Sequence, residues 1–396
     1  MSGKREVVVV GGARTAIGTF GGSLKDFAPV DLATLAVKTA IARAKVDPAR
    51  VGHLYMGTAI PTERRDTYLS RVASLNAGMV QESCAMNVNR LCGSGFQAIV
   101  SAAQSILLGD ADAAIGAGAE SMSRGGYLVP SARWGARMGD AQMIDMMVGA
   151  LTDPFSTDHM GITAENVAAR WHIGREEQDQ FALASQQKAV AAIAAGHFKS
   201  QIVPVEIKTR KGVVQFDTDE YPKADASLEA LAKLKPAFKR DGGVVTAGNA
   251  SGINDGAAAV VLMEAGAAAQ AGIKPLARLV SYGIAGVEPS YMGEGPIPAV
   301  KLAMQRAGLK FSDLAVIESN EAFAAQSICV NKGLDLDPSK VNPNGGAIAL
   351  GHPVGATGAI LAVKCIYELE RTGGRYGLVT MCIGGGQGIA GIFERL

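Results

Sequence analysis

The sequence predicts an α/β fold of layered sheets and helices, built from two related halves with a further region inserted between them. Short runs rich in Val and Ile alternate with Ala-rich helical patterns, which is the signature of such a fold. In the first part of the chain the order strand, helix, strand covers residues 7–10, 31–44 and 51–56. The same order returns late in the chain, over residues 276–280, 297–307 and 314–318.

The return of this order is also visible as an internal repeat. Residues 36–44 read AVKTAIARA and residues 299–307 read AVKLAMQRA, with six of the nine positions identical at a separation of 263. A strand–helix–strand unit is therefore predicted to occur twice. The alternative is two similar amphipathic helices, since such helices share one pattern of apolar positions.

The repeat suggests how the chain is divided. Residues 1–120, completed by about 249–270, form the N-terminal half, and residues 271–396 form the C-terminal half. Residues 121–248 form an inserted loop domain with two tryptophans and long helical stretches. Insertions on α/β frames commonly supply binding loops, so this region is expected to cover a site.

Composition excludes several classes of partner. The chain has 38 basic and 37 acidic residues and a net charge of +1, which gives no electrostatic footprint for nucleic acid or an anionic membrane. The uncharged stretch 91–109 contains Gly, Gln and Ser, which argue against a membrane span. We therefore expect neither a nucleic-acid nor a membrane partner.

The five cysteines are widely spaced and form no CxxC pair or Cys/His cluster, so no metal site is predicted. The N-terminus enters the strand-like run 7–10 without a secretory signal. Together these features predict a cytoplasmic protein with reduced thiols.

The first segment with chemical potential is NRLCGSGFQAI, residues 89–99. Its glycines fit a sharp turn before an Ala/Ile-rich helix, so Cys92 would lie near free backbone N–H groups at a helix N-terminus. Such groups favour the thiolate, and a strand–turn–helix setting is typical of a nucleophile. The alternative is an inert buried cysteine.

Two further segments carry candidate polar groups. His352 stands in the Gly/Pro-rich loop 342–358 and could act as a general base or donate a hydrogen bond to an oxyanion. It could equally be a loop histidine that satisfies local backbone groups. Asn320 follows the strand-like run 315–317 and could position a water or a carbonyl, although a strand-end Asn is also a common turn former.

The last segment, MCIGGGQG over residues 381–388, places Cys382 and Gly384 after the strand-like run 376–380. A glycine run there can present N–H groups to an anion. The alternative is a phosphate-binding loop with an incidental cysteine. Neither this run nor GGAR at 11–14 has the spacing of a dinucleotide fingerprint, which disfavours a nucleotide-binding oxidoreductase.

Taken in order, NRLCGSG, NEAF (320–323), GHPVGATG (351–358) and CIGGGQG (382–388) closely resemble the thiolase family, and the match starts at ARTAIG (13–18). The resemblance covers essentially the whole chain. It implies a thiolase-like five-layered α/β/α/β/α fold of two similar half-domains, with a loop domain on top. It also implies acyl-CoA and CoA as partners, a homo-oligomer (dimer or tetramer), and no cofactor, because the CoA thioesters are substrates.

The resemblance also implies roles. Cys92 matches the nucleophile that becomes acylated, and Cys382 matches the acid/base that moves the α-proton of acetyl-CoA. His352 matches the residue that activates the nucleophile and, with a water held by Asn320, binds the thioester oxygen of the second substrate. The N–H groups of Cys92 and Gly384 match the oxyanion hole of the acyl-enzyme. Such chemistry proceeds by covalent, ping-pong catalysis.

The segment HMGITAEN, residues 159–166, is similar to the short-chain, acetoacetyl-CoA class. In that class the histidine and methionine line the pantetheine and acyl pocket, which makes His159 and Met160 candidate binding residues. Long-chain degradative members usually lack the histidine.

Other candidate contacts rest on single positions. Ser251 matches a pantetheine contact, and Phe238 and Phe323 match apolar walls. Lys223 stands where short-chain relatives often carry an arginine against the nucleotide of CoA. Lysine keeps the charge but lacks planar stacking.

The predicted reaction is the reversible Claisen condensation of two acetyl-CoA to acetoacetyl-CoA and CoA, extended to slightly longer acyl chains. Its nearest alternative is a broad-range degradative 3-ketoacyl-CoA thiolase of fatty-acid β-oxidation. A β-ketoacyl synthase shares the fold but uses a Cys-His-His set, and here Cys382 occupies one of those places. A non-catalytic thiolase-like lipid carrier would lack a catalytic residue, and none is missing.

The remaining cysteines and histidines match no catalytic motif. We interpret Cys84, Cys329 and Cys365 as packing residues, and His53, His172 and His197 as structural or solvent-facing. The basic run 208–211 is interpreted as a solvated turn.

Overall fold

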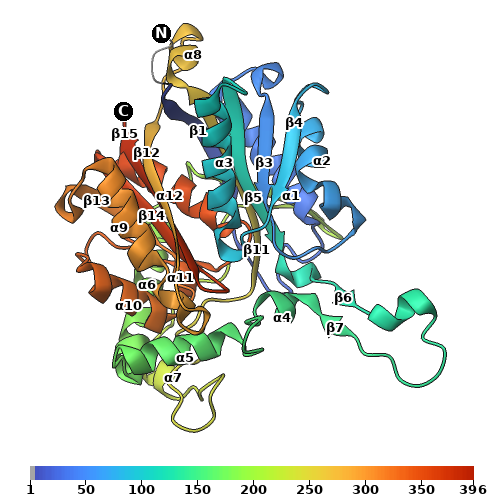
Figure 1. Cartoon of the computed structure of the whole chain (residues 1–396), viewed down its shortest axis with the longest axis vertical. Helices are drawn as coiled ribbons and strands as arrows, with labels where there is room; N and C mark the ends of the chain where they lie inside the picture. Colours follow the sequence, from blue (N-terminus) through green and yellow to red (C-terminus); the bar gives the residue numbers. More distant parts are fainter. Residues whose placement is uncertain (1–4) are drawn as a thin grey trace.

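The structure, a computed structural model, describes residues 5–396 (Figure 1). Residues 1–4, which belong to the segment predicted to lack a secretory signal, lie outside the described part. One mixed sheet runs through the molecule, with the strand order β13-β14-β15-β12-β1-β11-β5-β3-β4. Its first four strands come from the C-terminal part of the chain and the other five from the N-terminal part and β11.

The strands have the following bounds: β1 (Val7–Thr15), β2 (Gly18–Thr19), β3 (His53–Gly57), β4 (Cys84–Val88), β5 (Ala113–Ser121), β6 (Tyr127–Leu128), β7 (Ile144–Asp145), β8 (Ile202–Val203), β9 (Val205–Thr209), β10 (Gly212–Phe216), β11 (Asn254–Glu264), β12 (Ala277–Gly286), β13 (Leu314–Ser319), β14 (Tyr376–Ile383) and β15 (Gln387–Arg395). The helices are α1 (Pro29–Ala44), α2 (Leu69–Asn76), α3 (Ser94–Leu108), α4 (Met146–Ala150), α5 (Met160–Arg170), α6 (Arg175–Ala194), α7 (Leu228–Ala232), α8 (Ala265–Gln270), α9 (Pro296–Ala307), α10 (Ala324–Leu334), α11 (Ala347–Leu350) and α12 (Thr357–Thr372). The strands and helices predicted from the Val/Ile and Ala patterns are confirmed.

Two helices, α3 and α12, form the middle layer (Figure 1). Helix α3 packs on β3 and β5 and against α12, and α12 packs against β11 on one side and β13 and β14 on the other. Helices α1 and α2 pack on the strands of the first half, and α9 packs on β12 and β15. The strands of the two halves form the two β layers, with α3 and α12 between them, so the layers follow the order α/β/α/β/α. Helices α3 and α12 can approach closely because Gly358 has no side chain. A Cβ at this position would lie 2.2 Å from the backbone of Phe96.

The predicted repeat is confirmed by the structure. Helices α1 and α9 both end at a residue with left-handed backbone, Lys45 (φ 54°) and Gly308 (φ 66°), 263 positions apart. Helices α3 and α12 begin at Ser94 and Thr357, and these residues are also 263 positions apart. The first residues of β5 and β14 show the same separation. The two halves therefore share one topology.

The stretch Leu91–Leu108 is, within residues 5–396, the one helical segment long and apolar enough to cross a membrane by length and composition. In the structure it includes α3, whose residues are mostly buried between the strands of the first half and α12. A core helix of this kind accounts for its apolar character.

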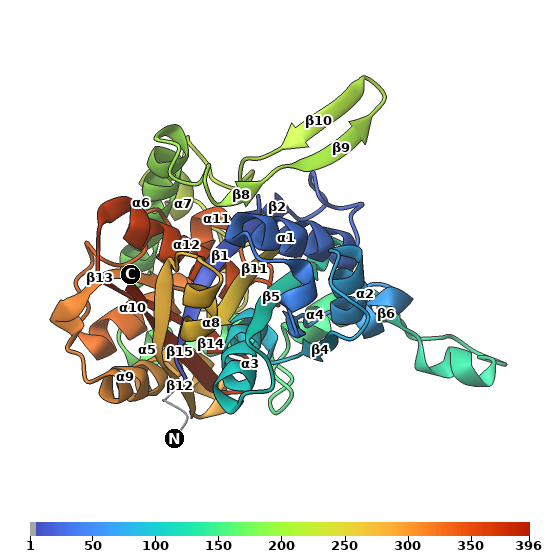
Figure 2. The same ribbon diagram turned by 90° about the horizontal axis from the view of Figure 1, so that it is seen from above.

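The region 121–248 carries two projections and a helical part. The segment from β6 to β7 and the β9–β10 hairpin both stand away from the body (Figure 2). Helices α5 and α6 pack against α10 of the second half. The basic run 208–211 lies at the tip of the β9–β10 hairpin and is exposed, as predicted.

The interpretation of the non-motif cysteines needs one correction. Cys329 and Cys365 are buried, as predicted for packing residues. Cys84 is exposed, and its prediction is wrong, because β4 lies at the edge of the sheet and its residues are exposed or half-buried along the whole strand.

Candidate active site

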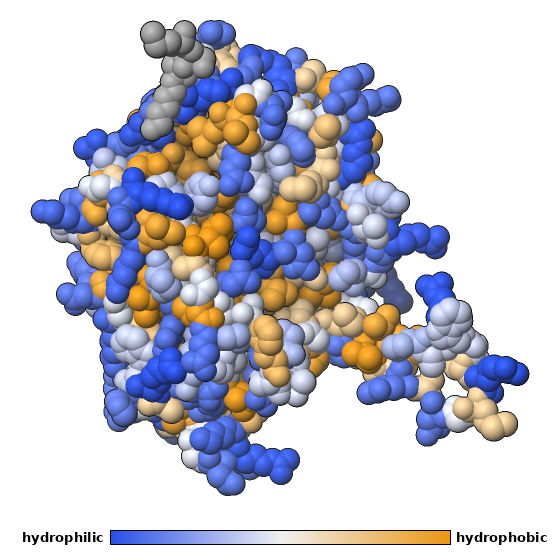
Figure 3. Space-filling model, viewed as in Figure 1, coloured by the Kyte–Doolittle hydropathy of each residue, from blue (hydrophilic) through white to orange (hydrophobic). Residues whose placement is uncertain are grey.

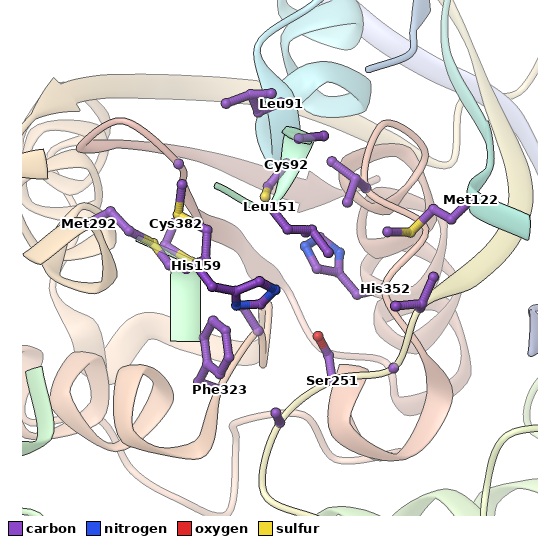
Figure 4. A pocket seen from close by; sticks show the side chains of 18 of the residues that line it. Leu91, Cys92, Met122, Leu151, His159, Ser251, Met292, Phe323, His352 and Cys382 are labelled. Carbon is purple, nitrogen blue, oxygen red and sulfur yellow. The ribbon is translucent and has the colours of Figure 1, made fainter. Parts of the chain in front are cut away.

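A cavity of about 340 Å³ lies where the turn before α3, the strand ends of the C-terminal half and the region 121–248 meet. Nine of the predicted site residues line it: Cys92, His159, Met160, Phe238, Ser251, Phe323, His352, Cys382 and Gly384. Figure 4 shows the two cysteine sulfurs and the rings of His352 and His159 turned toward one space. Residues more than 250 positions apart in the chain therefore meet at one point.

Cys92 lies on a strained turn that leads into α3. The preceding residue, Leu91, has a left-handed backbone (φ 45°), which non-glycine residues rarely adopt. Asn89 Oδ1 accepts a hydrogen bond from the N–H of Leu91 at 3.0 Å, and Ser94 Oγ donates to the carbonyl of Leu91 at 2.7 Å. The polar residues of the NRLCGSG motif thus hold the turn that presents Cys92.

The protonation state of Cys92 corrects one expectation. The sequence predicted that the helix N-terminus would favour a thiolate. Burial instead raises the pKa of Cys92 to about 11, although hydrogen bonds from the N–H groups of Gly384 and of Cys92 itself act to lower it. The prediction is wrong in its net direction because removal from water outweighs the two donors. The resting group is a thiol and needs a base.

His352 is suited to accept a proton. Burial lowers its pKa to about 4, so the ring is neutral at pH 7. The backbone N–H of His352 donates to Asn254 Oδ1 at 2.9 Å, and this hydrogen bond fixes the backbone of the loop. The ring nitrogen Nδ1 lies 2.7 Å from Thr357 Oγ1, and Nε2 lies 3.4 Å from Asn320 Nδ2. Both nitrogens therefore have a polar neighbour.

Asn320 is fully buried directly after β13 and does not itself line the cavity. Its N–H donates to the carbonyl of Thr380 at 3.0 Å, which ties it to β14. The side-chain oxygen Oδ1 has no hydrogen-bond partner among the described residues. A buried amide oxygen of this kind is free to accept a hydrogen bond from a water or a ligand.

Cys382 reaches the cavity from β14 and is fully buried. Burial raises its pKa well above the usual value, and the nearby Cys92 acts in the same direction. The turn after it, Gly384–Gly386, connects β14 to β15, and its last two residues have φ of 81° and 85°. Glycine suits such left-handed positions, and the turn brings the N–H of Gly384 to the sulfur of Cys92.

The side of the cavity formed by 121–248 is apolar and aromatic. The rings of His159 and Phe238 are stacked with centroids 4.7 Å apart, and Phe238 meets Phe323 edge to face at 6.1 Å. The Nδ1 of His159 accepts from the N–H of Gly161 at 3.0 Å, so a neutral His159 carries its proton on Nε2. Burial lowers the pKa of His159 and favours this neutral form.

Ser251 and Lys223 are the remaining residues of the predicted site. The N–H of Ser251, which lines the cavity, donates to the carbonyl of Ala322 at 3.0 Å. Lys223 lies outside the lining, with Nζ 5.9 Å from the ring centroid of Tyr221. Tyr221 itself lines the cavity, whereas the side chain of Lys223 is exposed.

Comparison with known families shows to which family the chain belongs. Residues 7–266 match the thiolase N-terminal domain and residues 273–395 match the thiolase C-terminal domain. The chain belongs to the thiolase family. Its fold is accordingly the thiolase fold, as the sequence motifs predicted.

The relatives are similar along their whole length. The beta-ketothiolase BktB of Cupriavidus necator is 64% identical over 392 residues, covering 99% of this chain and 100% of its own. The acetyl-CoA acetyltransferase of Escherichia coli is 48% identical over 394 residues, with coverage of 99% and 100%. The crystal structure of human mitochondrial 3-ketoacyl-CoA thiolase in complex with CoA has 44% identity and a TM-score of 0.95, with coverage of 99% and 98%.

Several wall residues of this thiolase were not predicted from its motifs. They are Leu91, Met122, Ala150, Leu151, Tyr221, Met292 and Val354. Most lie in segments without glycine runs or polar signals, so only the folded chain shows them to share a cavity. In residues 5–396 no group of three or more His, Cys, Asp or Glu side chains is arranged to hold a metal ion.

Proposed function

We propose that this thiolase catalyses the reversible condensation of two acetyl-CoA molecules to acetoacetyl-CoA and CoA. The observation that carries the proposal is the meeting of two cysteines and one neutral histidine in a single cavity. Relatives along the whole chain are named acetyl-CoA acetyltransferase and beta-ketothiolase, which supports the same reaction.

In the first half-reaction Cys92 is the nucleophile. Its thiol gives a proton to Nε2 of His352, and the sulfur attacks the carbonyl carbon of acetyl-CoA. The N–H groups of Cys92 and Gly384, which already point at this sulfur, stabilise the developing oxyanion. The C–S bond to CoA then breaks, and CoA leaves as a thiol with the proton from His352.

In the second half-reaction the thiol of Cys382 gives its proton to Nε2 of His352, and the resulting thiolate removes an α-proton from a second acetyl-CoA. The apolar surroundings that raise the pKa of Cys382 make its thiolate a strong base. His352 and a water held by the free Oδ1 of Asn320 bind the enolate oxygen. The enolate carbon attacks the acetyl group on Cys92 and a carbon–carbon bond forms. The bond between the acetyl carbon and the Cys92 sulfur breaks, and this sulfur takes back the proton that His352 holds.

The substrate range is proposed to be short-chain. The stacked rings of His159 and Phe238, together with Met160, narrow the cavity beside the reactive sulfurs. Ser251 is the proposed pantetheine contact, and the exposed Lys223, next to Tyr221, is proposed to reach the CoA nucleotide once CoA is bound. The alternative is a broad-range degradative enzyme, because one structural relative is named a 3-ketoacyl-CoA thiolase.

The test is a thiolysis panel. Purified enzyme is mixed with CoA and 3-ketoacyl-CoAs of rising chain length, with Cys92→Ser as the inactive control. We expect acetoacetyl-CoA to be cleaved best, with a decline beyond five carbons, and intact-mass analysis to show one acetyl group on Cys92. A flat profile to long chains would support the degradative enzyme, and no cleavage of any thioester would refute the proposal.

We further propose a homo-oligomer, dimer or tetramer, located in the cytoplasm and without a cofactor. The segment from β6 to β7 projects from the body with apolar surface exposed (Figure 3), including Leu128, Trp134, Met138 and Met143. Exposed apolar surface of this extent on a projection favours contact with a second copy of the chain. Size-exclusion chromatography with light scattering tests this proposal.

A further inference from the structure

The hydroxyl of Thr357 lies between two groups that can each accept its single proton. Thr357 Oγ1 is 2.9 Å from the carbonyl of Pro353 and 2.7 Å from Nδ1 of His352. All three residues are buried, and Thr357 is the first residue of α12, so the hydroxyl is held by the helix rather than by a mobile loop.

A hydroxyl can donate one hydrogen bond and accept others. When its proton goes to the carbonyl of Pro353, Thr357 accepts a hydrogen bond from Nδ1–H of His352. The second nitrogen, Nε2, then carries a lone pair. If the hydroxyl proton turned to Nδ1 instead, the ring proton would be on Nε2 and would face Nδ2 of Asn320, a donor that lies 3.4 Å away.

We propose that Thr357 is a positioning residue that holds the ring proton of neutral His352 on Nδ1 and so keeps Nε2 free to accept a proton. This inference rests on the proposed function, in which Nε2 accepts the proton of Cys92 in the first half-reaction and donates a hydrogen bond to the substrate oxygen in the second. The contact of Asn320 with Nε2 favours the same tautomer, because Nδ2 is a donor and Nε2 then offers it a lone pair.

The other neighbours of the ring leave this role to Thr357. Glu120, a buried carboxylate in β5, accepts hydrogen bonds from the N–H groups of Gly355, Ala59 and Ile60 at 2.7, 3.0 and 3.1 Å and does not contact the ring. No carboxylate is hydrogen-bonded to His352 among residues 5–396. The hydroxyl is therefore the group that holds the ring proton on Nδ1.

The test compares Thr357→Val, which keeps the shape and removes the hydroxyl, with Thr357→Ser, which keeps it. Thr34→Val is the matched control, because Thr34 Oγ1 bonds to the carbonyl four residues earlier, as Thr357 does, but in α1 and away from the cavity. We expect Thr357→Val to lower turnover roughly ten- to hundredfold, the worth of a buried hydrogen-bond partner, with KM little changed. Thr357→Ser should stay within a few-fold of the wild type, and Thr34→Val should match it.

A second measurement reads the ring directly and does not depend on the reaction. Nitrogen-15 NMR of labelled histidine resolves the two ring nitrogens, and the chain has only five histidines. The signals of His352, assigned with His352→Ala, should shift in free Thr357→Val and be unchanged in Thr34→Val. Unchanged His352 signals in Thr357→Val, or a Thr357→Ser enzyme as slow as Thr357→Val, would overturn the inference. Absence of acyl transfer by the wild type would refute the proposed function instead. The NMR result would still report which ring nitrogen of His352 is protonated, because it does not depend on the reaction.

Discussion

The side-chain nitrogen Nδ2 of Asn320 lies 3.4 Å from Nε2 of His352, although the two residues are separated by 32 positions and come from different loops. Both are buried, and the amide oxygen of Asn320 has no partner among the described residues. This pairing leads to the first prediction.

Asn320→Ala and His352→Ala should each lower turnover on the order of a hundredfold or more, the usual worth of one oxyanion donor. If the two residues act as one unit, the double variant should lose less than the product of the single losses. Steady-state kinetics of the three variants in the condensation direction measures this. Strictly multiplicative losses would show that the two residues serve separate steps.

The second prediction concerns the pKa of Cys92. Because burial raises this pKa to about 11, the thiolate fraction should keep rising with pH, and alkylation by iodoacetamide should accelerate about tenfold per pH unit between pH 7 and 10. Peptide mapping by mass spectrometry measures the alkylation of Cys92 and of the exposed Cys84 separately. Alkylation of Cys84 shows that the reagent is active. A plateau below pH 9 would mean that the N–H groups of Cys92 and Gly384 outweigh burial.

A third prediction separates the two catalytic sulfurs by step. Cys382→Ser should still accept an acetyl group from acetyl-CoA on Cys92, yet fail to form the carbon–carbon bond. A hydroxyl is a far poorer base than a thiolate, so the variant should also fail to exchange the methyl protons of acetyl-CoA with deuterated solvent. Exchange at the wild-type rate would exclude Cys382 as the base and leave His352 as the leading candidate.

A fourth prediction concerns Gly161, which makes room for the ring that stacks on His159. A Cβ at Gly161 would lie 2.2 Å from the ring of Phe238. Gly161→Ala should therefore displace the ring, destabilise the fold by about 1–3 kcal/mol, and raise KM for acetoacetyl-CoA.

The matched control for that variant is Gly149→Ala in α4, where a Cβ would meet nothing within 4 Å. Thermal unfolding and thiolysis kinetics are measured on both variants. Equal effects of the two substitutions would mean that the stacked pair of His159 and Phe238 does not shape the binding site.

The sequence alone determined the family, the layered fold and the motif residues of the site. Apolar periodicity fixed which segments are strands and helices, and the 263-residue repeat showed that one unit occurs twice. The glycine run of the CIGGGQG motif was predicted to follow a strand, and in the structure it follows β14. These features depend on neighbours in the chain, so a linear sequence carries them.

The tertiary structure decided what depends on neighbours in space. The pKa of Cys92 could not be predicted from its helix N-terminus, because the dominant cause is burial by distant segments. The exposure of Cys84 followed from the position of β4 at the edge of the sheet, which the sequence does not state. The place of the Thr357 hydroxyl between His352 and Pro353 likewise appears only in the folded chain, as does the absence of Lys223 from the cavity lining. Desolvation and hydrogen-bond geometry are set by the three-dimensional surroundings of a group, and those surroundings exist only after the two halves and the inserted region have packed together.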